Sequence, residues 1–381
     1  MYQLNLNWQE FLPQYWQKRP LVIRGAFDDF SDPISPEELA GLAMEPELDS
    51  RIVARQADKW QVAHGPFESF DAWGDTDWSL LVQAVDHWFE PVNALVAPFR
   101  GLPNWRLDDL MISYSLPGGG VGPHLDQYDV FIIQGMGRRR WRVGEPGQHR
   151  QHTPHPDLLQ VDAFEPIIDV ELMPGDMLYI PPGFPHDGYA LEPALNYSVG
   201  FRAPSGRELL SSFADHLLDK ELGGRRYSDP TLQTRPHPGQ IQQDEREGLR
   251  QLMLAQLADE QGFHHWLAGF LSQARHELDE QAVEPPFTVA ELREALAEQA
   301  LCRQGGVRCL YLDETPQQLF ILGEEIEVPA AGAALARLLA DDPAPAQAAL
   351  LAACAQPELG EWLLQLVNRG WWYFPSQDEE E

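Results

Sequence analysis

Residues 111–143 read MISYSLPGGGVGPHLDQYDVFIIQGMGRRRWRV, and this stretch decides the fold of the first half of the chain. Three glycines, Gly118 to Gly120, lead into His124 and Asp126, and an apolar segment, a Gly-Met-Gly turn and three arginines follow. Short apolar segments separated by glycine and proline continue to about residue 202, which is typical of an antiparallel β-sandwich or barrel. The sequence therefore predicts an antiparallel β-sandwich or barrel over this region.

Three side chains of the predicted barrel are candidate metal ligands. His124 and Asp126 are two residues apart, so on a strand their side chains leave from the same face. A third candidate, His186, ends the segment PGDMLYIPPGFPH at residues 174–186. A lone histidine near a strand end is more often an ordinary polar residue. Two imidazoles and one carboxylate with open coordination positions, however, form the facial triad of non-haem Fe(II) oxygenases.

The spacing around these residues resembles the two motifs of the cupins. Residues 118–126 resemble the first motif, with Asp126 where many cupins have a second histidine. The later glutamate of that motif is missing, because Val130 and Phe131 occupy its place. Residues 175–186 resemble the second motif. Both departures turn a four-ligand site into a three-ligand site, which leaves positions for a cosubstrate and oxygen.

A run of three arginines at 138–140 follows the predicted ligands. Strand alternation places Arg139 on the same face as the apolar side chains that follow it, and its two neighbours on the other face. An inward arginine near an iron site needs an anion, and the distal carboxylate of 2-oxoglutarate would fit it bidentately. Ser113 and Ser115 on the preceding strand could add hydroxyl contacts, and residues 196–198 are a weaker possible lining.

Helical and mixed regions follow the predicted barrel. Residues 207–218 have apolar side chains at helical spacing, and a loop over 223–239 separates them from a second helical block at 246–278. The apolar faces of such helices must pack against another surface. We favour a second copy of the chain as that surface, and packing inside the same chain is the open alternative. Residues 288–291 form a capping box. A helix, two short strands, two helical segments and a final aromatic strand then suggest a small winged-helix-like domain.

The composition narrows the classes of partner. A formal net charge of -32 argues against nucleic acid as a direct ligand and favours a basic partner, although an acidic surface also aids solubility. Residues 287–381 contain five Lys and Arg against sixteen Asp and Glu, so the winged-helix-like region is expected to be structural or protein-binding. No membrane span or signal peptide is visible, and the three cysteines follow no metal or disulfide spacing. We therefore expect a cytoplasmic protein.

The motifs together resemble a known family, the JmjC-type Fe(II)- and 2-oxoglutarate-dependent hydroxylases. Residues 113–145 and 174–192 are most similar to the bacterial ribosomal oxygenases, which hydroxylate an arginine of large-subunit ribosomal protein sixteen. The resemblance covers nearly the whole chain and implies an α+β protein. Its expected parts are a double-stranded β-helix (JmjC/cupin) barrel with an N-terminal extension, a helical dimerisation region and a winged-helix-like domain, at 1–205, 206–282 and 283–381.

The resemblance also implies roles for individual residues. His124, Asp126 and His186 would bind Fe(II), Arg139 would bind 2-oxoglutarate, and O2 would be the second cosubstrate. The substrate would be a basic ribosomal protein and the enzyme a homodimer. Two alternatives stay open: the same chemistry on another residue or protein, such as histidyl hydroxylation, or a metal-binding cupin scaffold without turnover. A scaffold would need neither the intact triad nor Arg139.

Overall fold

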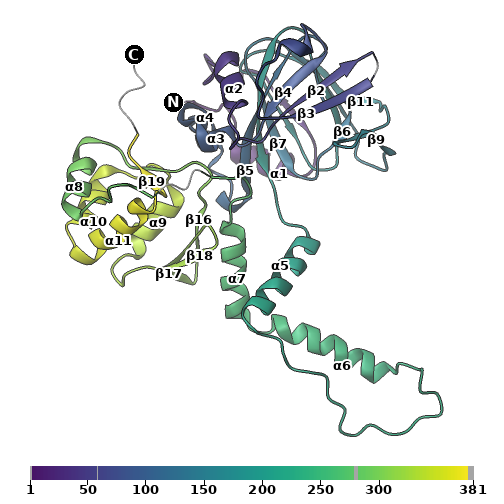
Figure 1. The fold of residues 1–381 in the computed structure, drawn as a ribbon, viewed down its shortest axis with the longest axis vertical. Coiled ribbons are helices and arrows are strands. Elements are labelled where there is room, and N and C mark those ends of the chain that lie inside the picture. The colour runs from purple at the N-terminus through teal and green to yellow at the C-terminus, as the bar shows by residue number, and fades with distance from the viewer. Residues whose placement is uncertain (1, 58, 279–281, 376–381) are drawn as a thin grey trace. The chain divides into compact units, whose positions relative to one another are not determined.

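A computed structural model describes residues 2–57, 59–278 and 282–375 of the chain (Figure 1). These residues fall into two compact units. The first unit comprises residues 1–203, 274–307 and 343–381, and the second comprises residues 204–273 and 308–342. The first unit contains the predicted barrel.

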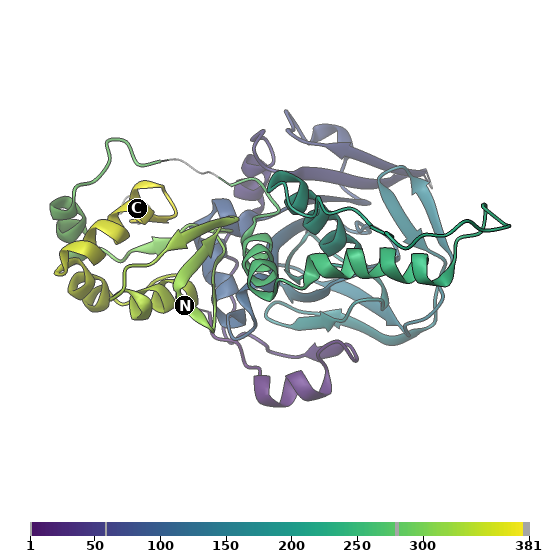
Figure 2. The same ribbon diagram turned by 90° about the horizontal axis from the view of Figure 1, so that it is seen from below.

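Two antiparallel sheets form this barrel (Figure 2). The larger sheet has the order β1-β12-β7-β14-β5-β4-β2-β3, with β1 Leu21–Ile23, β2 Ser50–Gln56, β3 Lys59–His64, β4 Trp78–Val82, β5 Leu107–Ser115, β7 Asp129–Gln134, β12 Met177–Ile180 and β14 Ala194–Phe201. The smaller sheet has the order β11-β8-β13-β6, with β6 His124–Leu125, β8 Arg139–Gly144, β11 Pro166–Leu172 and β13 Pro185–Ala190. The arrangement is the double-stranded β-helix that the sequence predicts.

Strand β7 shows how the sequence divides the core. Its residues are all buried, and successive side chains point to opposite faces of the sheet. Phe131 and Ile133 belong to the apolar cluster on the outer face, whereas Val130 and Ile132 pack inside the barrel. Because both faces of β7 are covered, its four central residues, 130–133, are continuously apolar rather than alternating.

Helices and turns of the N-terminal region cover the outer face of the larger sheet. They contribute Phe11, Leu39, Leu95 and Phe99 to the outer cluster. Ser35 and Glu38 form a capping box at the start of α2. The helices are α1 Trp8–Gln14, α2 Pro36–Leu42, α3 Val85–Trp88 and α4 Glu90–Val96, with short 3-10 helices η1 Asp71–Trp73, η2 Ala97–Phe99 and η3 Asn104–Arg106.

A hairpin and a set of helices complete the first unit. The hairpin consists of β9 Gln151–His155 and β10 Leu158–Val161. Thr288 caps α8 through the predicted capping box with Glu291. The other elements are α8 Val289–Glu298, β15 Cys302–Arg303, α10 Gln347–Cys354, α11 Pro357–Asn368 and β19 Trp372–Tyr373, where β15 pairs with β19.

Helix α7 packs against a three-stranded sheet in the second unit. The helices are α5 Gly206–Asp219, α6 Gln243–Leu254, η4 Ala255–Leu257, α7 Glu260–Ser272 and α9 Ala333–Asp341, and the strands are β16 Cys309–Leu312, β17 Thr315–Ile321 and β18 Glu324–Glu327. The predicted helical block at 246–278 is not one continuous helix, because Asp259 caps a new helix, α7. The block also ends earlier than predicted, at Ser272. Strand β18 was not predicted, since two helical segments were expected directly after the two short strands.

The predicted loop over residues 223–239 contains no helix or strand. The predicted domain boundaries after residues 205 and 282 stay predictions. Among the described residues, none of the helices has the length and apolar character that a membrane crossing requires.

Candidate metal centre

Two short segments bring the predicted metal ligands together. Strand β6 pairs with β13 so that His124 lies directly opposite His186. The preceding glycines permit this approach, because a Cβ at Gly120 would lie 2.3 Å from a carbonyl oxygen of β13. The carbonyl oxygen of Asp126 accepts a hydrogen bond of 2.8 Å from the N–H of Gly183, in the turn before β13. The backbone thus fixes all three candidate ligands locally.

The three side chains converge on one point. An Asp126 carboxylate oxygen lies 3.5 Å from Nε2 of His186 and 3.9 Å from Nε2 of His124. The two imidazole rings have centroids 4.2 Å apart. One ligand atom from each residue lies within 4.8 Å of the other two. A divalent ion placed between them would be coordinated on one side only, which is the geometry of a facial triad.

Backbone carbonyl groups determine which imidazole nitrogen is available to a metal. Nδ1 of His124 lies 2.9 Å from the carbonyl oxygen of Gly122, and Nδ1 of His186 lies 3.0 Å from that of Phe184. We assign the ring proton to Nδ1 in both residues, because only an N–H can donate to a carbonyl oxygen. Both Nε2 atoms face Asp126, and a metal ion that displaces the Nε2 proton of His186 would find both of them directed toward it.

The charges of the triad also suit a cation. Burial and the nearby His186 lower the pKa of His124 to about 4. Burial alone would raise the pKa of Asp126, but the hydrogen bond from His186 and the charge of His124 bring this pKa down to about 2. Asp126 is therefore ionised and His124 neutral at physiological pH, as metal binding requires, whereas the hydrogen bond to Asp126 raises the pKa of His186, whose Nε2 proton a bound metal would displace.

Arg139 lies in the same cavity and is almost completely buried, with 5% of its surface exposed. Its Nη1 donates to Oγ of Ser113 at 3.0 Å and of Ser115 at 3.2 Å, and its Nη2 donates to the carbonyl oxygen of Gly188 at 3.1 Å. Its guanidinium lies 5.3 Å from the ring centroid of Trp141. Burial lowers the pKa of Arg139 to about 10, so the side chain stays charged.

Arg139 forms no ion pair among the described residues, although the charge of Asp187 acts on it from a longer distance. Within the described part of the chain, no carboxylate lies at ion-pair distance from Arg139, and its buried Nε has no hydrogen-bond partner. A buried cation without a partner is costly. An anionic ligand in the cavity would offset that cost, as the sequence pattern predicts.

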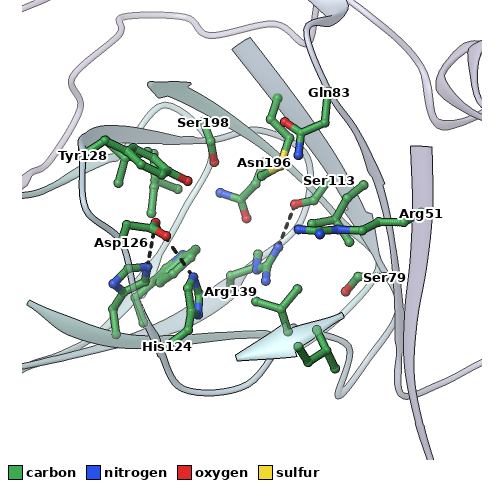
Figure 3. Close-up of a pocket in the computed structure, with 18 of the residues that line it drawn as sticks. Arg51, Ser79, Gln83, Ser113, His124, Asp126, Tyr128, Arg139, Asn196 and Ser198 are labelled. Atoms are coloured by element: carbon green, nitrogen blue, oxygen red, sulfur yellow. Dashed lines mark hydrogen bonds and ion pairs between the residues drawn. The ribbon is translucent and has the colours of Figure 1, made fainter. Parts of the chain in front are cut away.

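The triad and Arg139 line one cavity of about 200 Å³ between the two sheets (Figure 3). Ser113, Asn196 and Ser198 also line it, whereas Ser115 contacts it through Arg139 and Ser79. The structure thus brings together the predicted ligands, Arg139 and both predicted serines, whereas Tyr197 of the predicted lining points to the outer face, where its hydroxyl donates to Asp32. The remaining polar lining comes from Arg51, Ser79, Gln83, Tyr128 and Asp157.

Sequence reasoning missed this last set of polar residues. Tyr128 lies two residues after Asp126, so its position on the same face was available from strand alternation. Burial and the charges of Asp126 and Asp109 raise the pKa of Tyr128 well above its usual value, so its hydroxyl stays protonated. Arg51 lies in β2, and nothing in the sequence indicates that this strand joins the barrel sheet.

Comparisons with known proteins point in the same direction as this geometry. The family model described as a JmjC domain matches residues 94–209, and a ROXA-like winged helix matches residues 255–373. The ribosomal protein uL16 3-hydroxylase of Escherichia coli K12 is 57% identical over 98% of this chain and 99% of its own length. A probable ribosomal oxygenase of Haemophilus influenzae is 31% identical over 83% of this chain and 81% of its own length.

A solved structure of a relative superimposes on nearly the whole chain. YcfD, a ribosomal oxygenase from Escherichia coli, in complex with cobalt and 2-oxoglutarate, is 54% identical and superimposes with a TM-score of 0.89. The match covers 99% of this chain and 100% of YcfD. That relative therefore binds both a metal and 2-oxoglutarate.

Proposed function

Because this chain belongs to the JmjC-domain ribosomal oxygenases, which are 2-oxoglutarate-dependent enzymes, we propose that it hydroxylates an arginine side chain of ribosomal protein uL16. The cofactor is Fe(II), and the cosubstrates are 2-oxoglutarate and O2. The observation that carries the proposal is the meeting of three metal-ligand side chains and one unmatched buried arginine in a single cavity. A binding scaffold without turnover would need neither feature.

His124, Asp126 and His186 are the residues that hold the iron in this proposal. Their donor set fits Fe(II), because two imidazole nitrogens and one carboxylate occupy one side of the ion. With Fe(II), 2-oxoglutarate and O2 bound, such a centre couples decarboxylation of the cosubstrate to insertion of one oxygen atom into a C–H bond of the substrate. The contribution of the chain is to keep Asp126 ionised and both Nε2 atoms directed toward it.

Arg139 holds the distal carboxylate of 2-oxoglutarate in this proposal. Ser113 and Ser115 position its guanidinium from the opposite sheet, and both serines are buried. The cosubstrate would therefore lie between the two sheets, with its keto acid end toward the triad. Burial of Arg139 excludes water from this contact and strengthens it.

The lining near the triad supports a cationic target side chain. Tyr128 and Ser198 both line the cavity, and their hydroxyl oxygens can accept hydrogen bonds from a guanidinium. The charges of Asp108 and Asp109 also raise the pKa of Tyr128, so the environment of this hydroxyl is acidic. A guanidinium is the side chain that such a lining stabilises best, and an arginine is therefore the target that we propose.

The test is to incubate the enzyme with uL16, Fe(II), 2-oxoglutarate and O2, and to map the uL16 peptides by mass spectrometry. We expect one added oxygen on one arginine, dependent on 2-oxoglutarate and accompanied by succinate. His186→Ala should abolish both products, whereas His152→Ala, a change at an exposed histidine of β9, should not. Oxygen on a histidine would refute the arginine target. Absence of succinate and oxygen with uL16 would favour the scaffold.

Homodimer formation is part of the proposal. Phe213 of α5 packs against Trp266 of α7 with ring centroids 4.8 Å apart, so part of the apolar surface of the helices is covered within the chain. Leu210, Leu218 and Met253 nevertheless expose 68%, 75% and 75% of their surface. Apolar surface of this extent on helices is typical of an association site. A second copy of the chain is the partner that we propose for it.

The cytoplasm is the proposed location, because the proposed substrate is a ribosomal protein. Direct contact with RNA is not expected, since a net charge of -32 would repel the phosphate backbone. The enzyme is therefore expected to recognise the basic protein itself.

A further inference from the structure

Arg51 faces the same cavity as Arg139, but from the N-terminal part of the larger sheet. Asn196 pairs with Ser113, Ser113 with Leu81, and Leu81 with Arg51, across strands β14, β5, β4 and β2. Residues opposite one another in neighbouring strands point to the same face of a sheet. All four residues line the cavity, and Figure 3 shows Arg51 extending into it.

The charge of Arg51 has no carboxylate partner either. Within the described ranges, no carboxylate lies at ion-pair distance from Arg51, and its Nε is buried without a hydrogen-bond partner. Asp157 lines the same cavity, but it lies 3.3 Å from His64 and 3.5 Å from His155. Two guanidinium groups without an ion-paired carboxylate among the described residues, those of Arg51 and Arg139, therefore share one cavity of about 200 Å³.

Arg51 lies within reach of a ligand bound to Arg139. Two strand spacings separate the backbones of Arg51 and Ser113 by about 10 Å, and Figure 3 shows the side chain of Arg51 directed toward Ser113. Ser113 itself accepts a hydrogen bond from Arg139 at 3.0 Å. A carboxylate held at Arg139 and Ser113 would thus lie on the side toward which Arg51 extends.

We propose that Arg51 is a second cationic contact for the distal carboxylate of 2-oxoglutarate and for the succinate product. Arg139 already donates three hydrogen bonds to protein oxygens, which leaves few donors for a ligand. A carboxylate offers about four acceptor positions, so a second guanidinium completes its coordination. Arg51 also supplies positive charge to a protein of net charge -32, which must bind a dianion. This inference rests on the proposed positions of iron and cosubstrate.

The experiment is an anaerobic titration of the Fe(II)-loaded protein with 2-oxoglutarate, read by absorbance without turnover. We expect Arg51→Gln to weaken 2-oxoglutarate binding about tenfold, and Arg51→Lys to recover most of this loss because it keeps the charge. The matched control is Arg55→Gln, on the same strand but exposed and outside the cavity, which should bind normally. Unchanged thermal unfolding would show that each variant folds.

A second titration identifies the group that Arg51 contacts. Pyruvate is a 2-oxo acid without the distal carboxylate, so its dissociation constant should be the same for Arg51→Gln and the unaltered protein. Equal weakening of both ligands would overturn the inference, because Arg51 would then act at the iron end or on the fold. Unchanged 2-oxoglutarate binding with a raised KM for uL16 would assign Arg51 to the protein substrate and would also overturn it. If the unaltered protein bound no 2-oxoglutarate, the proposed function itself would fail.

Discussion

Nη1 of Arg139 donates a hydrogen bond to Oγ of Ser113 at 3.0 Å, from the smaller sheet of the barrel to the larger one. The bond connects β8 with β5 across the interior and fixes the guanidinium of a side chain that is 5% exposed. Such a group is already oriented before a ligand binds, so little side-chain entropy is lost on binding.

Replacement of Arg139 should therefore affect the cosubstrate much more than the metal. Loss of a charge-assisted contact in a shielded cavity costs about 1.5–3 kcal/mol, so Arg139→Ala should raise the KM for 2-oxoglutarate by roughly 10- to 150-fold. Iron binding should change little, because the triad does not contact Arg139 through an ion pair. Arg138→Ala is the matched control, since Arg138 points outward to Glu192 at 3.1 Å. An unchanged KM in Arg139→Ala would assign the carboxylate to another residue.

The sequence was sufficient for the parts of the site that depend on local periodicity. Strand alternation placed Arg139 inward, and β8 indeed buries Arg139, Trp141 and Val143, while the intervening arginines 140 and 142 are less buried. The two-residue spacing of His124 and Asp126 likewise implied a common face. The pairing of His124 with His186 required recognition of two motifs in the correct order, because no local rule connects residues 62 positions apart.

The features that were missed depend on non-local pairing or on weak propensity. Arg51 reaches the cavity only because β2 joins β5 through β4, and sheet order cannot be read from periodicity. Strand β18, with the sequence EEIE, is rich in a residue depleted from strands, and pairing with β17 after the turn at Gly323 overrides that preference. Asp259 interrupts a run of helical spacing by capping α7, and a polar residue there was equally consistent with one exposed helical face.

A buried aspartate of the N-terminal extension should make stability depend on pH. Asp86 is 5% exposed, and burial raises its pKa to about 6, although the N–H of Leu110 donates to it and Arg100 and His276 lie near it. The native state therefore takes up a proton as the pH falls through about 6, whereas the unfolded chain does so only near 4. Between these values the native state binds more protons, so the contribution of Asp86 to the free energy of unfolding decreases as the pH rises.

Asp86→Asn removes this ionisation and keeps an oxygen that can accept from Leu110. We expect the variant to raise the free energy of unfolding by about 1–2 kcal/mol at pH 8 and to change it little at pH 4.5. Urea unfolding at both pH values measures the difference, and the exposed Asp75→Asn is the control. Stabilisation of equal size at both pH values would show that ionisation of Asp86 is not its cause.

The exposed apolar side chains of α5 and α6 predict the oligomeric state. Leu210 and Leu218 are eight residues apart in α5, so they lie on one face of that helix. Replacing both with serine should convert a dimer into a monomer at micromolar concentration, as measured by light scattering. Met44→Ser, which changes a 45%-exposed side chain of the barrel unit, should leave the dimer intact. A monomeric unaltered protein would refute the prediction directly.

Association with the basic substrate should depend strongly on salt. A chain of net charge -32 attracts a basic protein over distances that dissolved ions screen, because the Debye length falls to about 8 Å at physiological ionic strength. We expect the association rate constant for uL16 to fall about tenfold between roughly 50 and 300 mM salt, with a much smaller change in the dissociation rate constant. Stopped-flow binding measures both rates. A short uL16 peptide around the proposed target arginine carries less charge and should show a flatter dependence. Equal slopes for peptide and whole protein would place the attraction in the cavity alone, rather than in the charge of the whole chain.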